Sequence, residues 1–389
     1  MAHIEKRQRR NADGTVGPVR WRARYRTAKG EERSRTFARK IDAERWLATV
    51  EASKVRGDWI DPQVQQVSVQ ELGDRLLSTK RDPNTKAWNR AMLRHVTDRW
   101  GSDAVVSVNH LDVQAWVNEL EVAGRGPDTV RGAFRVLHET IALALRARII
   151  GHDPCLGVRL PRVQRREMLF LEPRQINTLA AALDERWPIS GHGLAVRFAA
   201  YSGCRAGEIC ALRVSDLDLD GRQVNIVLAR KSYGADGAPK TGRTRWVDLP
   251  KQLCDELRTY LAARNLAGGD RVWTGERGGP LDHKWFYRHR FKPVVEELSA
   301  AGALPTSIVE TAAGPKTYTP RFHDLRHSCV AMLIARGAQQ YEVMEHLGHT
   351  NIQTTINTYG HLFPSVRVRI RSALEKAWAT AAVKSPAAK

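Results

Sequence analysis

The sequence has few of the features that mark secreted or membrane proteins. Its 389 residues include only five cysteines, at positions 155, 204, 210, 254 and 329, and none of them forms a CxxC pair. The odd count argues against a disulfide framework and favours the reducing cytosol. The amino terminus lacks the apolar core of a signal peptide, and no uncharged apolar run is long enough to cross a bilayer. We therefore expect a soluble, cytoplasmic protein without a membrane partner.

Acidic residues are scarce relative to basic ones. The chain has 42 Asp and Glu against 62 Lys and Arg, which gives a formal net charge of +20 and an isoelectric point of about 10.2. Such an excess is the electrostatic signature of a nucleic-acid partner. It is concentrated in residues 1–60, which hold 16 Lys or Arg and 8 Asp or Glu.

The first basic segment has a strand pattern. In residues 19–26 apolar side chains alternate with arginines, so the two sets lie on opposite faces of a strand, one able to pack and one able to meet phosphate. A second strand is predicted over 32–37 and a helix over about 42–56, with Trp46 and Val50 laying that helix on the sheet. The candidate DNA-binding residues are Arg20, Arg22, Arg24 and Arg26.

The rest of the chain is predicted to be mainly helical. Ser68 and Glu71 form a capping-box pattern ahead of an apolar helix, and further helices are predicted over 85–100, 111–122 and 129–150. Strands are predicted near 223–229 and 244–249, a helix over 366–380, and the Gly- and Pro-containing segment Leu298–Pro320 as a loop insertion of unknown role. The predicted fold class is multidomain, mainly α with small β-sheets (α+β). The expected parts are residues 1–62, 67–160 and 168–389, with a basic linker at 161–167.

Four short stretches carry side chains suited to attack on a phosphodiester. They are SGCRAGE with Arg205, HDLRH with His323 and Arg326, LGH with His349, and NTYGH with Tyr359. Arginine forks neutralise the nonbridging oxygens of a phosphate, and they remain charged at every physiological pH. A tyrosine phenol is a poor nucleophile at neutral pH unless a base and a positive field assist it, and histidines can supply that help. Glu208, Asp324 and His327 are the candidate supporting residues, which orient their neighbours.

The spacing in the second stretch supports this grouping. His323, Arg326 and His327 stand at i, i+3 and i+4 and would share one helix face. Their place near a helix N-terminus also favours an anion, because free N–H groups and the helix dipole point at it. Gly337 is a plausible stop for this helix.

These stretches resemble the conserved boxes of the tyrosine recombinases, the phage integrase family. The resemblance implies that Arg205, Arg326 and His349 hold the scissile phosphate, that His323 assists proton transfer and that Tyr359 forms a 3′-phosphotyrosyl link. In the family a lysine on a β-hairpin protonates the departing 5′ oxygen, and Lys240 in PKTGRTRWVDLP matches that position. Lys316, in a similar Gly-Pro-Lys-Thr context, ranks second because an alternating strand follows Lys240. No metal, ATP or other cofactor is implied.

The resemblance also implies an organisation and partners. Residues 1–62 resemble an arm-type DNA-binding domain, which favours an integrase of a temperate phage or integrative element acting on two attachment sites in double-stranded DNA. A homotetramer on DNA, a DNA-bending host factor and a directionality factor are the implied partners. The carboxy-terminal segment is expected to dock on a neighbouring protomer, against the alternative that it packs on its own domain.

Other functions remain open at this point. A type IB topoisomerase shares the chemistry, and a plasmid- or chromosome-resolving recombinase shares the boxes. A metal-dependent hydrolase or nuclease would use the i, i+4 pair His323 and His327 with His346 or His349, but Asp324 stands where a zinc metalloprotease has glutamate, and Arg326 would place a cation beside the metal. A non-catalytic DNA-binding protein would not need the complete set of polar groups.

Overall fold

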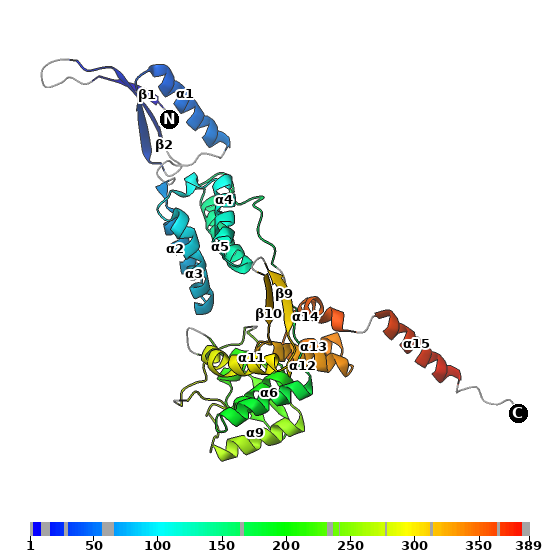
Figure 1. Cartoon of the computed structure of the whole chain (residues 1–389). Helices are drawn as coiled ribbons and strands as arrows, with labels where there is room; N and C mark the ends of the chain where they lie inside the picture. Colours follow the sequence, from blue (N-terminus) through cyan, green and yellow to red (C-terminus); the bar gives the residue numbers. More distant parts are fainter. Residues whose placement is uncertain are drawn as a thin grey trace. The chain divides into compact units, whose positions relative to one another are not determined.

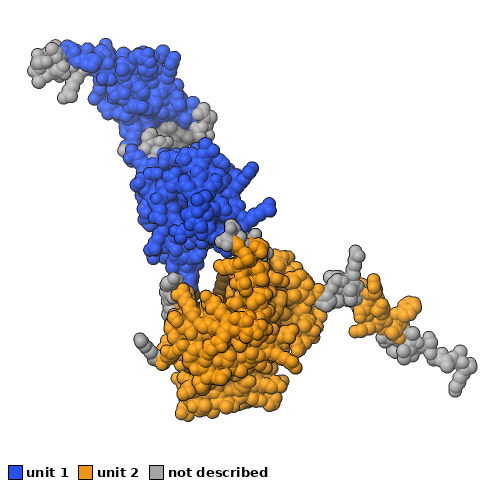
Figure 2. All heavy atoms as spheres, in the orientation of Figure 1, with its two compact units in different colours: residues 1–164 blue, residues 165–389 orange. Residues whose placement is uncertain are grey.

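The computed structural model describes residues 3–8, 16–26, 30–56, 66–163, 167–231, 236–240, 242–276, 278–311, 314–363 and 366–382. The chain divides into two units, residues 1–164 and 165–389, shown in different colours in Figure 2. The predicted boundary at residue 62 and part of the predicted linker fall outside the described residues. No helix in these ranges is long and apolar enough to span a membrane.

The first unit begins with a three-stranded antiparallel sheet, in the order β1 (His3–Arg7), β2 (Arg20–Arg26) and β3 (Glu32–Phe37). Helix α1 (Lys40–Arg56) covers one face, where the Trp46 ring lies 5.6 Å from that of Tyr25 and 5.5 Å from that of Phe37. The strand–strand–helix prediction is confirmed. Strand β1 was not predicted, because its sequence HIEKR has no apolar alternation and it is a strand only through pairing with β2.

The opposite face of the sheet carries the candidate arginines. Arg24 bonds to Glu5 at 2.8 Å and to Glu32 at 2.7 Å, so its charge is largely compensated within the sheet. Arg22 donates to Ser34 Oγ at 2.8 Å. The remaining two, Arg20 and Arg26, are exposed.

The remainder of the first unit is a helical bundle. Its members are α2 (Val69–Thr79), α3 (Pro83–Trp100), the 3₁₀ turn η2 (Val105–Ser107), α4 (His110–Val122) and α5 (Pro127–Arg146). Ser68 Oγ accepts from the Glu71 amide at 3.1 Å, as the capping pattern predicted. Trp100 and Trp116 meet edge to face in the core, 5.1 Å apart. The predicted helices are confirmed, but α5 ends before residue 150, because Arg148 has a φ of 54° that no α-helix continues through.

The described residues of the second unit are mainly helical, as Figure 1 shows, and form three small antiparallel sheets. Its helices are α6 (Pro173–Arg186), α7 (His192–Ser202), α8 (Ala206–Ala211), η3 (Val214–Asp216), α9 (Lys251–Ala263), α10 (His283–Phe286), the π-helical turn η4 (Tyr287–Phe291), α11 (Lys292–Ala300), α12 (Asp324–Ala335), α13 (Gln340–Leu347), α14 (Ile352–Tyr359), η5 (Gly360–Leu362) and α15 (Val366–Ala382). Its strands are β4 (Leu217–Asp218), β5 (Gln223–Ile226), β6 (Ala229–Arg230), β7 (Asp236–Gly237), β8 (Arg245–Asp248), β9 (Ser307–Thr311) and β10 (Gly314–Tyr318).

Two apolar clusters hold this unit together. The larger one includes Phe198 of α7 against Trp273, with ring centroids 5.0 Å apart, and extends to α6, α9 and the β5–β8 pair. The smaller one joins α12, α13 and α14 through Val330, Val343 and Tyr359. Because Tyr359 is part of a core, the position of its hydroxyl is fixed by packing.

The prediction of a loop over Leu298–Pro320 is wrong. Leu298 is still in α11, and the segment then forms the antiparallel hairpin β9–β10, in which Lys316 pairs with Val309. The β-branched Ile308, Val309 and Thr317 favour strand structure. Pro315 is tolerated because a two-stranded ribbon consists of edges only.

Candidate active site

Five of the six predicted catalytic residues come from four places in the second unit. Arg205 is the N-cap of α8, His323 is the N-cap of α12, His349 follows α13, and Tyr359 is the last residue of α14. The first turn of α12 contains Arg326, as the spacing predicted. Gly337, with a φ of 92°, follows the end of that helix.

Two glycines let these segments pack closely. Gly203 and Gly348 have φ values of 62° and 65°, a backbone conformation that side-chain-bearing residues rarely adopt. A Cβ on Gly203 would lie 3.0 Å from the Leu347 side chain, and one on Gly348 would lie 2.6 Å from Arg245 Cδ. The turn that carries Arg205 and the loop that carries His349 therefore lie directly against their neighbours.

Glu208 binds two arginines. Its Oε1 accepts from Arg205 Nη1 and Arg245 Nη1, each at 3.1 Å, and its Oε2 accepts from Arg245 Nη2 and the Arg205 amide, each at 2.8 Å. Only 1% of the Glu208 side chain and 9% of that of Arg245 are exposed. Burial acts to raise the pKa of Glu208, but the hydrogen bonds and charge of Arg245, helped by Arg205, lower it below its ordinary value. Glu208 therefore remains ionised, and its carboxylate holds both the backbone amide and the guanidinium of Arg205 in place.

Arg326 is deeply buried, with 3% of its surface exposed. Its guanidinium donates to the carbonyls of Gly203 and Leu347 and, at 3.1 Å, to His349 Nε2. Burial and then repulsion from Arg205 lower its pKa to about 10. Even so, it carries its charge at neutral pH, and the partners it has among the described residues are carbonyls and an imidazole rather than a carboxylate.

The tautomer of His349 follows from its partners. Arg326 can only donate, so Nε2 of His349 must be the accepting nitrogen. The proton is therefore on Nδ1, which donates to Thr355 Oγ1 at 2.9 Å. Burial and the charges of Arg326 and Arg205 lower the pKa of His349 to about 4, so the ring is neutral.

Tyr359 is withdrawn from solvent, with 2% of its surface exposed. Its hydroxyl lies 2.8 Å from Nδ1 of His327, whose own exposed fraction is 9%. Burial raises the pKa of Tyr359 to about 12, although Arg326 and Arg205 both act to lower it. The phenol is neutral in this state and feels the field of both predicted phosphate-binding arginines.

His323 and Asp324 contribute less directly. The His323 ring is exposed and stands perpendicular to that of His327, with centroids 5.0 Å apart. Asp324 is fully buried and accepts from the backbone and side chain of Arg321, at 2.7 and 2.9 Å. Through these bonds it stabilises the start of α12.

The two candidate lysines lie apart from these contacts. Lys240 is exposed in the connection between β7 and β8, next to a turn in which the Gly242 amide donates to Pro239 O at 2.8 Å. Lys316 is exposed in β10, with its ammonium 5.4 Å from the Tyr318 ring centre. Neither ammonium bonds to the arginines or histidines above in the ranges that the structure describes.

Two contact residues were not singled out from the sequence. Arg245 lies two residues before the buried Val247 in the same strand, so both side chains point to the same, inward face of the sheet. An arginine at an inward-facing strand position is a signal that could have been found in the sequence. Thr355 stands four residues before Tyr359, on the same face of α14, which places its hydroxyl within reach of the same site.

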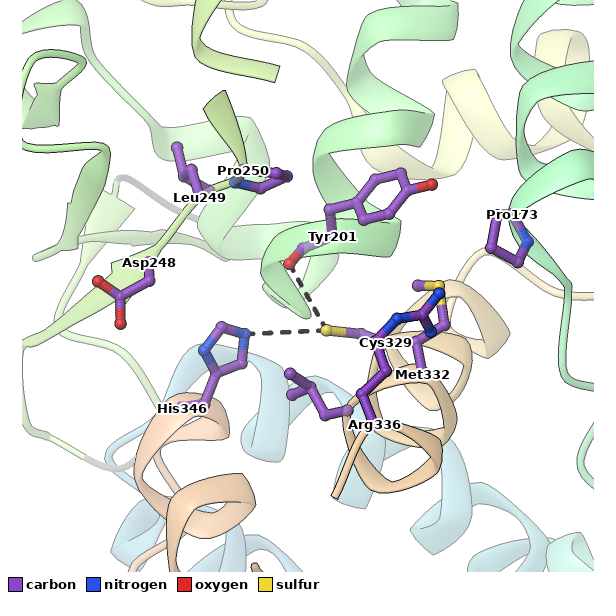
Figure 3. Close-up of a pocket in the computed structure, with 10 residues that line it drawn as sticks. Pro173, Tyr201, Asp248, Leu249, Pro250, Cys329, Met332, Arg336 and His346 are labelled. Carbon is purple, nitrogen blue, oxygen red and sulfur yellow. Dashed lines mark hydrogen bonds between the residues drawn. The ribbon is translucent and has the colours of Figure 1, made fainter. Parts of the chain in front are cut away.

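A cavity of about 540 Å³ lies beside the site, on another side of α12 (Figure 3). Tyr201, Met332 and Leu333 give it an apolar lining, and Cys329 points into it between Tyr201 O and His346 Nε2. A second hollow shares Leu333 and His346 and is bordered by the acidic residues Asp248, Glu342 and Glu345. We call the two together the α12–α13 groove.

The zinc-site alternative has no support in the geometry. His327 is bonded to Tyr359, and His349 is bonded to Arg326 and Thr355. Across the described ranges, no group of three His, Cys, Asp or Glu side chains is arranged to hold a metal ion.

Comparison with known proteins identifies the family. Residues 169–365 match the phage integrase family, and residues 19–56 match the phage integrase N-terminal domain. The chain belongs to the phage integrase family. These proteins are the tyrosine recombinases, which are DNA strand transferases. The predicted family and enzyme class are confirmed.

Relatives of this family member include an integrase and a tyrosine recombinase. It is 23% identical to the ICEBs1 integrase of Bacillus subtilis, over 72% of this chain and 74% of that protein. It is 27% identical to the tyrosine recombinase XerC of Bacillus pumilus, over 67% of this chain and 79% of the relative.

Solved integrase structures share its fold. The Tn1549 transposon integrase in complex with transposon right-end DNA matches with a TM-score of 0.64 and 20% identity, covering 80% of this chain and 99% of that one. A lambda integrase dimer bound to a COC′ core site matches with a TM-score of 0.58 and 16% identity, covering 90% and 93%. The predicted mainly helical, multidomain fold class is confirmed.

Proposed function

We propose that this tyrosine recombinase cleaves and rejoins double-stranded DNA through Tyr359 to integrate or excise a mobile element. Arg205, Arg326 and His349 hold the scissile phosphate, Tyr359 attacks it to leave a 3′-phosphotyrosine, and Lys240 protonates the departing 5′ oxygen. The 5′ end of the partner duplex then reverses the step. The bond energy is kept in the protein–DNA link, so the proposal needs no ATP, metal or other cofactor.

The observation that carries this proposal is an unbalanced cluster of positive charge around a phenol. Arg205, Arg245 and Arg326 are wholly or largely buried, and Glu208 is the carboxylate that pairs with the first two. Repulsion between Arg205 and Arg326 contributes to the lowered pKa of Arg326. A phosphodiester placed between these two guanidinium groups would relieve that repulsion, and the same groups favour the phenolate form of Tyr359.

The described arrangement is a resting one. Tyr359 is buried and bonded to His327, and the two guanidinium groups are engaged by Glu208, carbonyls and His349. Cleavage therefore requires DNA to displace some of these bonds and requires the segment that bears Tyr359 to shift. His349 must also release Arg326 and gain a proton on Nε2 before that nitrogen can donate to a phosphate oxygen.

The amino-terminal sheet supports an arm-type DNA-binding role for residues 1–62. Arg20 and Arg26 are exposed on the face of the sheet that α1 does not cover, whereas Arg24 forms ion pairs with two glutamates. We therefore assign phosphate contacts first to Arg20 and Arg26 and then to Arg22. The helical part, residues 67–160, is proposed to bind the core site together with the catalytic part, residues 168–389. A DNA-bending host factor and a directionality factor complete the proposed nucleoid-associated complex in the bacterial cytoplasm.

Exchange between two duplexes requires four active sites, so we propose a homotetramer on DNA, the state that a lambda integrase shows on a Holliday junction. Helix α15 presents an apolar stripe at i, i+4 and i+8, with Ile370, Leu374 and Trp378 between 53% and 80% exposed. It also carries the basic residues Arg371 and Lys376. We propose that it binds the α12–α13 groove of a second copy, because that groove has an apolar floor and its three carboxylates, Asp248, Glu342 and Glu345, outnumber Arg245 and Arg336 in its lining.

Covalent trapping tests the reaction. The protein is incubated in EDTA with nicked duplexes from its source genome and analysed on a denaturing gel beside Tyr359→Phe. A DNA-linked band that depends on Tyr359 is expected, and sequencing the DNA gives the crossover site. Cleavage that needs a metal ion, or adducts that survive in Tyr359→Phe, would refute the proposal. Relaxation of supercoils without a second site would point to a type IB topoisomerase.

A further inference from the structure

The position of Lys240 depends on how the backbone on either side of it is held, because the side chain itself is exposed. Strand β7 precedes it and pairs with β6, with Asp236 opposite Arg230. Asp236 lies four residues before Lys240, and an extended chain of that length spans at most about 14 Å. The contacts of Asp236 therefore limit where the lysine can lie.

The Asp236 carboxylate is bonded through both of its oxygens. Oδ1 accepts from Arg230 Nη1 at 3.2 Å, and Oδ2 accepts from Arg271 Nη2. Only 10% of the Asp236 side chain and 19% of that of Arg271 are exposed. Ion pairs that are largely withdrawn from water are screened much less than surface pairs. Two arginines thus hold the backbone that leads to Lys240.

Both of these arginines also contact α8, the helix whose N-cap is Arg205. Arg271 Nη1 donates to the carbonyl of Cys210 in that helix at 3.2 Å. The backbone of Arg230 lies against Gly207, where a Cβ would be 2.8 Å from the Arg230 carbonyl oxygen. One carboxylate therefore joins the segment before the proposed general acid to the helix that begins beside a phosphate-binding arginine.

The chain after Lys240 is bonded to the same helix. Arg245, the first residue of β8, donates to Glu208 of α8 at 3.1 and 2.8 Å. The segment that carries Lys240 is thus attached to α8 on both sides, by ion pairs with little exposure to water. Because Arg205 is the N-cap of α8, the fold sets the separation between the proposed acid and this arginine.

We propose that Asp236 is a positioning residue for the general acid. This inference rests on the proposed function, in which Lys240 assists departure of the 5′ oxygen. In that step the bond between phosphorus and the 5′ oxygen breaks, the oxygen keeps the electron pair, and the Lys240 ammonium supplies the proton that the oxygen takes up. Asp236 acts through Arg271 and Arg230 to keep that ammonium within reach of the leaving oxygen while Arg205 holds the phosphate.

Two duplexes test a role that acts through the acid. One has the normal 5′ oxygen at the crossover site recovered by trapping, and the other has sulfur in that bridging position, whose departure needs no proton. Asp236→Asn keeps the size of the side chain but removes its charge and replaces one acceptor by a donor. Its rate of adduct formation should fall about tenfold or more on the oxygen duplex and stay within about threefold of wild type on the sulfur duplex. Lys240→Ala should show the same pattern with a larger loss.

The ratio of the two rates separates positioning from damage to the fold. Misfolded protein lowers both rates by the same factor, so it leaves their ratio unchanged. Arg271→Lys keeps the charge, but its single ammonium cannot span Asp236 and the Cys210 carbonyl as a guanidinium does, and it should change the ratio in the same direction. Asp184→Asn is the matched control, because Asp184 accepts from Arg197 at 3.0 Å in the same unit but lies in α6. It should leave the ratio within about twofold of wild type.

A double variant tests the path of the effect. If Asp236 acts through Arg271, then Asp236→Asn combined with Arg271→Lys should be about as slow on the oxygen duplex as the slower single variant. Losses that multiply would refute the path through Arg271. An Asp236→Asn rate close to wild type on the oxygen duplex, or an equal loss on both duplexes, would overturn the positioning role.

Failure of the proposed function has a different signature. If the sulfur duplex does not restore Lys240→Ala, then Lys240 is not the acid, and the inference falls with that assignment. Adducts that persist in Tyr359→Phe would refute the proposed nucleophile, whatever the rate of Asp236→Asn. A sulfur duplex that restores Lys240→Ala but not Asp236→Asn would refute the positioning role alone.

Discussion

Replacement of Arg245 by methionine should destabilise the catalytic part of the protein more than an ordinary arginine substitution. Methionine keeps most of the side-chain volume but removes both hydrogen bonds to Glu208. Removing one partner of a buried ion pair costs about 3–5 kcal/mol when the other charge is left without compensation. Glu208 keeps its bonds to Arg205, so the lower end of this range applies. For a unit of this size about 1 kcal/mol corresponds to about 2–4 °C in melting temperature. The expected loss is therefore on the order of 10 °C in the transition of the catalytic unit, measured by calorimetry.

The loss should depend on pH in a defined direction. In the wild-type protein Arg245 lowers the pKa of Glu208, so the pair stabilises the fold above the ordinary carboxyl range and loses its effect as pH falls through the lowered value. In Arg245→Met the effect of burial on Glu208 is no longer offset by Arg245, so the pKa of Glu208 rises. The variant then takes up a proton as the buffer is acidified toward about pH 5. The difference in melting temperature between the wild-type protein and Arg245→Met should be largest near pH 7 and should become smaller as the pH is lowered.

Two controls separate this effect from general damage. Arg243→Met removes a neighbouring but exposed charge, and it should change the melting temperature by no more than about 1–2 °C. In the double variant Arg245→Met with Glu208→Gln the buried carboxylate is gone, and the charge that loses its partner is Arg205, whose side chain is 24% exposed, so part of the lost stability should return. The role given to the Arg245–Glu208 pair would be refuted if Arg245→Met lowered the melting temperature by less than about 2 °C. It would also be refuted if the difference from the wild-type protein became larger at acidic pH.

Four other changes have defined outcomes. Thr355→Val removes the acceptor for His349 Nδ1 and should lower the cleavage rate about tenfold with a loss of about 1 kcal/mol in stability; unchanged kinetics in single-turnover assays would contradict the proposed tautomer. Lys316→Ala should cleave like wild type while Lys240→Ala does not, and the reverse result in the same assay would move the general acid to the β9–β10 hairpin. Truncation after Phe363 should leave DNA binding intact but weaken tetramers in native gels or mass photometry, and Trp378→Ala should do so in part; tetramers that persist without α15 would remove its docking role. All five cysteines are buried, and burial raises the pKa of Cys155, Cys210 and Cys329 to about 12. A thiol reagent should therefore label the cysteines rapidly only after denaturation. Fast labelling of the native protein would contradict their burial.

The sequence predicted those elements whose signals are local. The capping pattern at Ser68 and the apolar repeat in α12 depend on residues three and four apart, and both are present in the structure. The elements that were missed lack such local signals. Strand β1 has no pattern of its own, and the β9–β10 hairpin was obscured by Gly314 and Pro315, which a two-stranded ribbon tolerates.

The same distinction applies to the site. Residue types and motif spacing named the arginines, the histidines and the tyrosine, because phosphate chemistry restricts the choice of side chain. The bonds between them span long separations in the chain, such as 37 residues from Glu208 to Arg245 and 32 from His327 to Tyr359. No periodicity encodes such pairs, so the sequence could not distinguish His327 from His323 as the neighbour of the phenol.

The resting contacts share one physical principle. Four groups that the reaction needs are bonded within the site: Arg205 to Glu208, Arg326 to His349, and Tyr359 to His327. A phosphodiester carries one negative charge and two nonbridging oxygens that can accept hydrogen bonds. In this state no such anion lies between Arg205 and Arg326. When it enters, the arginines can exchange carbonyl and imidazole acceptors for phosphate oxygens, and the lone pair on His349 becomes free to take a proton and donate. Substrate binding and assembly of the active groups are therefore one event, because the ligand that is cleaved is also the ion that rearranges the site.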